Sequence, residues 1–325
     1  MRRQLFVATQ HGILTLELRG DVWQGVGGAL DGHHFTSITN AGEALLAGTT
    51  DGIYRSEDAG QTWWESSTGL EQRHLRSLAY HPDDPDLAFA GTEPAAIFIS
   101  EDGGRTWQER PEIAQLREEH GWYLPYSPAA GCIRGFAFRG SRGYAAAEQG
   151  GLLSSDNSGQ SWQLAGGSTG KPGGTPAQRF IHSDVHSVAI HPSSVDQIWA
   201  PTGGGLYYST DGGDAWSQLH DRYCRAVWVD AVRPAHLVLG TADAADRNGQ
   251  VEKTINNGDS WELAMGGLPP ALPQHMVEQF LEVDDTLLAI LSNGELLSSA
   301  LEPMAWRTVL AAVHDVRAAT LIRSM

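Results

Sequence analysis

Apolar and polar residues alternate over short stretches along most of this chain, and turn-forming residues separate the stretches. One unit shows the order: "DVHSVAIHP" from residue 184, "QIWAPTGGG" from 197, "GLYYSTD" from 205 and "WSQL" from 216. A period of two predicts strands, because amphipathic helices carry apolar residues at a period near 3.6. The pattern therefore predicts four short strands per unit, joined by tight turns.

An octamer of the form S-x-D/N-x-G-x-x-W recurs at the last turn of successive units. Its copies are Ser56–Trp63, Ser100–Trp107, Ser155–Trp162, Ser209–Trp216 and Thr254–Trp261, with tryptophans 44, 55, 54 and 45 residues apart. Eroded copies, Leu16–Trp23 and Ser299–Trp306, extend the series at both ends. Seven four-stranded units, repeated at roughly 45 residues, predict an all-β, seven-bladed β-propeller.

The two ends of the chain together supply one repeat. The 19 residues after Trp306 and the 22 before Trp23 add up to about one unit. "VHDVRAATLI" (313–322) resembles a first strand and "LFVATQHG" (5–12) a second. We therefore expect a single domain over residues 1–325, in which residues 313–325 complete the first blade with residues 1–25. Such closure would leave no open sheet edge.

The octamers resemble the Asp-box, or BNR, repeat. This repeat occurs in sialidases, xyloglucanase-type glycoside hydrolases, sortilin-like receptors and the photosystem II assembly factor. Segments such as "LAYHPDDPDLAFAGT" (78–92) are similar to the repeats of uncharacterised bacterial BNR proteins. The resemblance covers nearly the whole chain and implies the propeller fold, but folds of this kind host unrelated functions.

Within the octamer, the conserved residue types suit a hairpin. The carboxylates and amides of Asp58, Asp102, Asn157, Asp211 and Asn256 can accept hydrogen bonds from backbone N–H groups in the turn. The glycine two positions later supplies a positive φ, and the tryptophan packs between sheets. We interpret the octamer as structural. The resemblance implies that any active site lies on the opposite face.

The residues that two enzymatic activities of the family require are not evident in this sequence. Sialidases carry an Arg-Ile-Pro signature, and this chain has only "ERPE" (109–112) and "VRPA" (232–235). A xyloglucanase is expected to be larger and to present two catalytic carboxylates in an open cleft, and no such pair is evident. A sialidase is therefore not expected.

Aligning the innermost strands places one residue of each blade in a ring at the start of the channel. These ring residues are Thr36, Arg76, Arg134, His186, Arg225, Glu278 and Arg317. Guanidinium groups match carboxylate, sulfate or phosphate, so the four arginines are candidates for anion binding. His186 and Glu278 are then the candidate catalytic acid–base pair. The alternative is that the arginines pair with carboxylates such as Asp184 or Asp315 and tie blades together. Strand bulges decide which way these side chains point.

Imidazoles are frequent just beside the ring, at His33, His34, His74, His275 and His314, with His182 in a nearby loop. His74 and His182 are candidate ligand-binding residues. A transition-metal site is an alternative for this histidine cluster, but no His-x-His or H-E-x-x-H spacing supports it. No cofactor or metal is expected.

Three insertions are expected at the channel mouth, at residues 111–131, 166–183 and 242–250. Long loops on a rigid scaffold often carry function. Trp122 and Tyr123 in the first insertion are candidates for a lid over a ligand, or alternatively for a plug at the top of the barrel.

Composition limits the classes of partner and the location that we expect. The formal charge is −17, from 22 basic and 39 acidic side chains, which argues against nucleic acid and anionic membranes as partners. Cys132 and Cys224 are the two cysteines, too few for a disulfide framework. The first residues lack the apolar run of a signal peptide, so a cytoplasmic location is expected.

These features favour a propeller that binds a small anionic ligand at the channel mouth, or acts on it as a lyase, hydrolase or isomerase. One alternative is a non-catalytic assembly scaffold that binds a protein partner, similar to the photosystem II assembly factor. A second alternative is a glycoside hydrolase, which needs two carboxylates about 5–9.5 Å apart.

Overall fold

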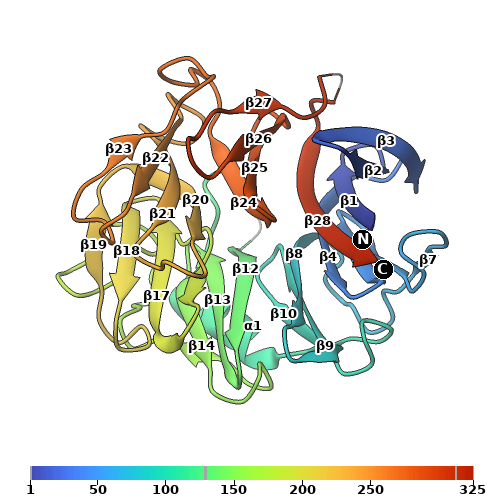
Figure 1. The fold of residues 1–325 in the computed structure, drawn as a ribbon. Helices are drawn as coiled ribbons and strands as arrows, with labels where there is room; N and C mark the ends of the chain where they lie inside the picture. The colour runs from blue at the N-terminus through green and yellow to red at the C-terminus, as the bar shows by residue number, and fades with distance from the viewer. Residues whose placement is uncertain (1, 128–129, 312, 325) are drawn as a thin grey trace.

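Seven four-stranded antiparallel sheets form a ring around a central channel in the computed structural model (Figure 1). The structure describes residues 2–127, 130–311 and 313–324. The ends of the expected first blade, residues 1 and 325, and positions 128–129 of the first insertion lie outside this description. The all-β, seven-bladed propeller is confirmed.

Each blade runs from an innermost strand at the channel to a short outermost strand. From the innermost strand outward, blade 1 contains β28 (Val316–Ser324), β1 (Arg2–Thr9), β2 (Ile13–Arg19) and β3 (Val22–Ala29). Blade 2 contains β4 (Phe35–Ala41), β5 (Ala44–Thr49), β6 (Gly52–Ser56) and β7 (Trp64–Glu65). Blade 3 contains β8 (Leu75–His81), β9 (Asp84–Thr92), β10 (Ile97–Ser100) and β11 (Gln108–Glu109).

The remaining blades follow the same order. Blade 4 contains β12 (Cys132–Arg139), β13 (Arg142–Glu148), β14 (Gly151–Ser155) and β15 (Gln163–Leu164). Blade 5 contains β16 (Ala189–His191), β17 (Ser194–Thr202), β18 (Gly205–Ser209) and β19 (Ser217–His220). Blade 6 contains β20 (Tyr223–Val229), β21 (Leu237–Ala242), β22 (Gln250–Thr254) and β23 (Glu262–Leu263). Blade 7 contains β24 (Val277–Val283), β25 (Thr286–Leu291), β26 (Leu296–Ala300) and β27 (Arg307–Thr308).

The ring closes through blade 1. Strand β28 pairs antiparallel with β1, from Arg2 opposite Ser324 to Thr9 opposite Val316. In Figure 1 the red β28 lies beside the blue β1. The C-terminal segment therefore supplies the innermost strand of the first blade, as the repeat lengths predict.

The core lies between neighbouring blades. Phe89 of blade 3, for example, stacks on Phe138 of blade 4 with ring centroids 4.3 Å apart, and Trp162 packs edge-on against Phe89. Seven such apolar clusters line the interfaces around the ring. Burying apolar surface between sheets holds the blades in place, because no single four-stranded sheet can cover both of its faces.

The five octamers form nearly identical hairpins. In the copy at Ser100, the Ser100 hydroxyl donates to Asp102 Oδ1 (2.7 Å) and accepts from Gly104 N (2.8 Å). Asp102 Oδ1 accepts from Thr106 N (2.9 Å). The same three bonds recur in the other four copies, with asparagine in place of aspartate in two of them. The structural interpretation of the octamer is confirmed.

The hairpins also join consecutive blades. Trp107 of blade 3 donates its Nε1–H to Ser66 O of blade 2 (2.9 Å), and Trp306 of blade 7 donates to Ala264 O of blade 6 (2.8 Å). Gly104 has φ +88° and lies so close to blade 2 that a Cβ there would come within 2.6 Å of Leu46. Each octamer is thus a contact point between neighbouring sheets.

One helix departs from the sequence prediction. Helix α1 (Pro111–His120) fills the first half of the first insertion, begins with proline and ends at Gly121 with φ +64°. Proline suits the first turn of a helix and glycine its end. No helix in the described residues is long and apolar enough to cross a membrane.

Candidate functional site

The ring residues occupy a bulge in every innermost strand. In blade 3, Leu75 pairs with Thr92 and Ser77 with Gly91, so Arg76 has no partner and the register shifts by one residue. The same shift occurs at the other ring positions, and in blade 5 the pairs Val185–Thr202 and Ala189–Trp199 bracket it. A bulge re-aims the side chain that it carries.

Contacts across the channel show where these side chains point. Arg134 Nη2 of blade 4 lies 3.2 Å from Glu278 Oε2 of blade 7. These two blades are not neighbours in the ring, so the contact crosses the channel (Figure 1). The bulges therefore turn at least these ring side chains into the channel.

Three ring arginines contact the residue that ends or follows the second strand of their own blade. Arg134 Nη1 lies 3.0 Å from Glu148 Oε2, and Arg76 Nη1 lies 2.9 Å from Glu93 Oε2. When the side-chain amide of Gln10 is oriented with its oxygen towards Arg317, that oxygen accepts hydrogen bonds from the Arg317 guanidinium. Sequence reasoning missed Glu93 and Glu148, although aligning the ends of the second strands would have found them.

Glu278 joins two arginines. It accepts from Arg134 and, through Oε1, from Arg225 Nη1 of the adjacent blade 6. Arg225 also lies 3.5 Å from Asp246 of the third insertion, and its Nε donates to Tyr223 (3.0 Å). Three of the four arginines therefore have carboxylate partners, as the alternative interpretation predicts.

A buried acidic cluster lies beside this network, between blades 4 and 5. It consists of Glu148, Asp184 and His186, whose nearest ligand-type atoms lie within 4.8 Å of one another. The His186 side chain is 1% exposed, and its Nε2 is 3.4 Å from Asp184 Oδ2. Neither ring nitrogen of His186 has a hydrogen-bond partner, and nor does Asp184 Oδ1. Sequence reasoning had named His186 as an acid–base candidate and Asp184 as a possible partner of the arginines, but it missed Glu148, which comes from a second strand.

The environment sets different protonation states in this cluster. Burial raises the pKa of Asp184 to about 6, and the Glu148 charge adds to that rise. Burial acts in the same direction on Glu148, but the charge of Arg134 and hydrogen bonds outweigh it and lower the Glu148 pKa to about 2. Burial, then the charge of Arg134, holds the pKa of His186 well below its ordinary value. At neutral pH the cluster thus presents a neutral imidazole and ionised carboxylates.

The first two insertions meet above this cluster. Trp122 is buried at 3% exposure, and its Nε1–H donates to Gly170 O of the second insertion (2.7 Å). Tyr123 is 51% exposed. Tyr126 donates its hydroxyl to Glu148 Oε1 (2.7 Å). Trp122 thus anchors the loops as in the plug interpretation, whereas Tyr126, which sequence reasoning did not select, reaches the acidic cluster.

The predicted histidine cluster does not come together as a metal site. Among the described residues, Glu148, Asp184 and His186 are the group with metal-ligand geometry, and none of the five clustered histidines belongs to it. His33 packs against Tyr54 instead, with ring centroids 4.7 Å apart. His182 Nδ1 accepts from Asp184 N (3.1 Å), so it fixes the loop that carries Asp184. Burial lowers the pKa of both His74 and His182.

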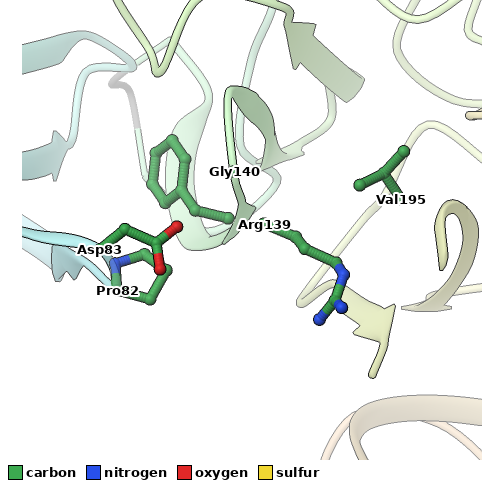
Figure 2. Close-up of a pocket in the computed structure, with 6 residues that line it drawn as sticks. Pro82, Asp83, Arg139, Gly140 and Val195 are labelled. Atoms are coloured by element: carbon green, nitrogen blue, oxygen red, sulfur yellow. The ribbon is translucent and has the colours of Figure 1, made fainter. Parts of the chain in front are cut away.

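A separate hollow lies on the other face. It has a volume of about 470 Å³ and is lined by Pro82, Asp83, Phe138, Arg139, Gly140 and Val195 (Figure 2). These residues belong to the end of a first strand, to the turn that follows it or to the start of the second strand, at the end of the channel opposite the ring residues. The hollow is therefore separate from the mouth.

The fold and its hairpins define a seven-bladed β-propeller built from Asp-box repeats. Among solved structures, the chain is similar to the GH74 xyloglucanase from Xanthomonas campestris, with a TM-score of 0.64 and 17% identity over 95% of this chain and 47% of that one. It is also similar to YCF48 bound to D1 peptide, with a TM-score of 0.59 and 15% identity over 92% and 91% of the two chains. YCF48 from Cyanidioschyzon merolae gives a TM-score of 0.59 and 16% identity over 88% of each chain.

One curated protein matches a short segment: the vacuolar protein sorting/targeting protein 10 of Schizosaccharomyces japonicus, 32% identical over 63 residues. That segment is 19% of this chain and 4% of the fungal protein, and the chain spans less than half of the xyloglucanase. No family model matches the chain. At these identities the likeness shows the fold, and the resemblance to BNR-repeat propellers is confirmed at that level.

Proposed function

We propose that this propeller is a non-catalytic scaffold that binds a segment of a partner protein at its channel mouth. The observation that carries the proposal is the internal pairing of the ring arginines. Arg76, Arg134 and Arg225 each have a carboxylate partner, and their side chains are only 14–23% exposed. A small anion would have to displace these carboxylates, at the cost of leaving them buried and unpaired.

The accessible groups around the mouth suit a polypeptide better. They combine the exposed ring arginine Arg317, the exposed aromatic rings of Tyr123 and Tyr126, and the carboxylate of Asp246, which is about half exposed. Aromatic and arginine side chains are enriched where proteins bind one another, and mixed charges give such contacts their specificity.

The solved structures that resemble this chain also favour a scaffold that binds a protein segment. YCF48 matches this chain along 91% of its own length, and its structure contains a bound D1 peptide. Glycoside hydrolysis, by contrast, needs two carboxylates separated across an open cleft. The neighbouring carboxylates Glu148 and Asp184 at this mouth are mostly buried, and their oxygen atoms lie within 4.8 Å of each other, so they do not form such a pair across an open cleft.

A small anionic ligand remains the second candidate, on one observation. In the described part of the chain Arg317 forms no ion pair with a carboxylate and contacts the neutral Gln10 instead. An anion could bind there without displacing a charged group. In that case Arg76, Arg134, Arg225, His74 and His182 would complete the site, with His186 and Glu278 as its acid–base pair.

Site-specific photocrosslinking tests the proposal. Benzoylphenylalanine is placed at Tyr123 in the full chain, in cells of the source organism, and at Val232 as a control that is 88% exposed on the opposite face. We expect one discrete partner segment to crosslink from position 123 and not from position 232. A synthetic peptide of that segment should then bind the purified protein in fluorescence polarisation.

A charge reversal locates the binding site. Arg317→Glu should weaken that peptide at least tenfold, whereas Arg19→Glu, on the outer part of the same blade and 59% exposed, should leave binding unchanged. Equal crosslinking from both positions would refute the mouth as the binding surface. A saturable thermal shift with phosphate, sulfate or sugar acids that Arg317→Glu abolishes would favour the small-anion candidate instead.

A further inference from the structure

We propose that Glu148, Asp184 and His186 form a binding site for a divalent first-row transition metal ion, between blades 4 and 5 at the channel mouth. This site is independent of the partner protein proposed above. It also differs from the histidine cluster that the sequence suggested, because two of its three groups are carboxylates.

The three groups are close enough to share an ion. Their ligand atoms lie within 4.8 Å of one another, and ligands at about 2.1 Å from a tetrahedral metal are separated by about 3.4 Å. The side chains of Asp184 and His186 must therefore move towards Glu148 when an ion binds. Glu148 comes from β13 of blade 4, whereas Asp184 and His186 come from the segment that leads into β16 of blade 5.

The second observation is a set of buried polar atoms without partners. Both ring nitrogens of His186 and Asp184 Oδ1 are inaccessible to solvent and form no hydrogen bond with the residues that the structure describes. Buried polar groups are nearly always satisfied, because desolvation without a partner is unfavourable. His186 Nε2 lies 3.4 Å from Asp184 Oδ2 within the cluster, and a metal ion there would satisfy a nitrogen and a carboxylate oxygen together.

Glu148 is oriented in the way that metal ligands commonly are. Tyr126 donates to its Oε1 (2.7 Å) and Arg134 to its Oε2 (3.0 Å). The Cys132 thiol also donates to Oε2 (3.4 Å), so Oε1 is the oxygen that keeps a lone pair for an ion. Such outer hydrogen bonds fix ligands for metal binding.

The charges around the site limit the affinity. Arg134 lies next to Glu148 and repels a cation, but Glu278 also pairs with Arg134 and with Arg225. Glu148, Asp184 and Glu278 together carry one negative charge more than the two arginines. We therefore expect weaker binding than at a site of the same ligands without neighbouring arginines.

The donor set selects the kind of metal. A neutral imidazole with two carboxylates suits Zn²⁺, Mn²⁺ or Fe²⁺, whereas Ca²⁺ and Mg²⁺ prefer oxygen ligands alone. Because Tyr126 of the first insertion contacts Glu148, an ion here would also fix the position of that loop over the mouth.

Calorimetric titration with Zn²⁺ and Mn²⁺ tests the site on the full chain after treatment with a chelator. We expect one ion per chain, and at least a thirtyfold loss of affinity in Asp184→Asn and in Glu148→Gln. Glu93→Gln is the matched control. Glu93 holds the place in blade 3 that Glu148 holds in blade 4 and pairs with Arg76, but it belongs to no metal-ligand group. The affinity of the Glu93→Gln variant for Zn²⁺ and Mn²⁺ should equal that of the unsubstituted protein.

A spectroscopic readout keeps the test decisive if a substituted chain folds poorly. Co²⁺ bound to the unsubstituted protein should give visible absorption bands of a site with a nitrogen ligand, and Zn²⁺ should displace it. The absence of stoichiometric binding would overturn the proposal, and so would equal affinity in Asp184→Asn, in a chain with unchanged circular dichroism. Equal binding of Ca²⁺ or Mg²⁺ would overturn the assignment to a transition metal.

Discussion

Gly103 and Gly104 are adjacent residues of one Asp-box hairpin with similar backbones and different surroundings. Both have positive φ, +70° and +88°. A Cβ at position 103 would meet nothing closer than 3.5 Å, whereas a Cβ at position 104 would approach Leu46 of the neighbouring blade to 2.6 Å. The pair therefore separates backbone strain from the contact between blades.

We expect Gly104→Ala to destabilise the protein more than Gly103→Ala. The left-handed backbone costs about 1 kcal/mol at either position. Overpacking against Leu46 should add about 1–3 kcal/mol at position 104 only. Denaturant unfolding of the two variants measures the difference. Equal stabilities would mean that Leu46 moves aside freely and that the hairpin does not hold the blades together.

The aspartates of the hairpins predict a loss of stability in acid. Hydrogen bonds from the hydroxyl and amide of Thr62 lower the pKa of Asp58 to about 2. For Asp102, burial opposes the shift, but hydrogen bonds from Thr106 outweigh it and the pKa is again about 2. Both values lie below the ordinary 3.8. The two carboxylates therefore stabilise the fold above about pH 4 and lose that contribution as the pH falls towards 2.

The chain itself suggests the variant that tests this dependence. Asn157 and Asn256 occupy the same position in other hairpins, and each donates Nδ2 to the serine four residues later (2.9 Å). Asp58→Asn with Asp102→Asn should therefore keep the fold at pH 7. Its unfolding free energy should fall less steeply between pH 4 and pH 2 than that of the unsubstituted protein. A parallel fall would show that other carboxylates dominate acid unfolding.

At the scale of elements, the bulged innermost strands organise the mouth. Glu278 on β24 accepts from arginines on β12 and β20, and so links three blades. Glu278→Gln should destabilise the protein by about 1–3 kcal/mol, because Arg134 and Arg225 are mostly buried and would lose a charged partner.

An exposed pair is the control for this prediction. Glu65 is paired with Arg73, and their side chains are 54% and 40% exposed, so Glu65→Gln should cost less than about 1 kcal/mol. Both variants are compared by thermal and denaturant unfolding. If Glu278→Gln costs no more than Glu65→Gln, the ion pairs across the channel do not tie the blades together.

The sequence predicts the blades well because each carries its own local signals. The hairpin of Ser100–Trp107 needs only residues within eight positions, and Asp102 accepts a backbone N–H in the turn as predicted, while the two bonds of the Ser100 hydroxyl were not foreseen. Helix α1 was missed because its sequence, "PEIAQLREEH", buries only Ile113, and so has no apolar face to detect.

The site was only half predictable for a different reason. Aligning the first strands found Arg134 and His186, but their partners Glu148 and Asp184 come from another strand and another column. The contact of Arg134 with Glu278 joins two residues of different blades that are 144 positions apart in sequence. Only the ring geometry brings such residues together, and no local pattern encodes it. Whether His186 and Glu278 act on any ligand stays a prediction.

At the scale of the whole molecule, the ring depends on the pair formed by β28 and β1. Deleting residues 313–325 should abolish cooperative unfolding and cause aggregation. It would expose the edge of β1, whose residues Leu5 to Ala8 are buried, with at most 1% exposure. Light scattering and a thermal melt measure the two effects. A truncated chain with a sharp, reversible transition would contradict the prediction.

A circular permutant is the control for this truncation. Arg2 and Ser324 pair across the two strands, so a short glycine–serine linker can join residue 325 to residue 1. New ends are placed between Gly174 and Thr175, in an exposed stretch of the second insertion. This chain contains every strand and should unfold cooperatively, which would assign the effect of the truncation to the lost β28.

The pairing of β28 with β1 also determines when the ring can close during biosynthesis. Strand β1 (Arg2–Thr9) leaves the ribosome long before β28 (Val316–Ser324), which covers it. At about 5–20 residues per second, the wait lasts on the order of tens of seconds. During that time the apolar face of β1 stays uncovered in a chain that cannot yet form its ring. We therefore expect nascent chains of this protein to bind chaperones until β28 has emerged, and the ring to close only then.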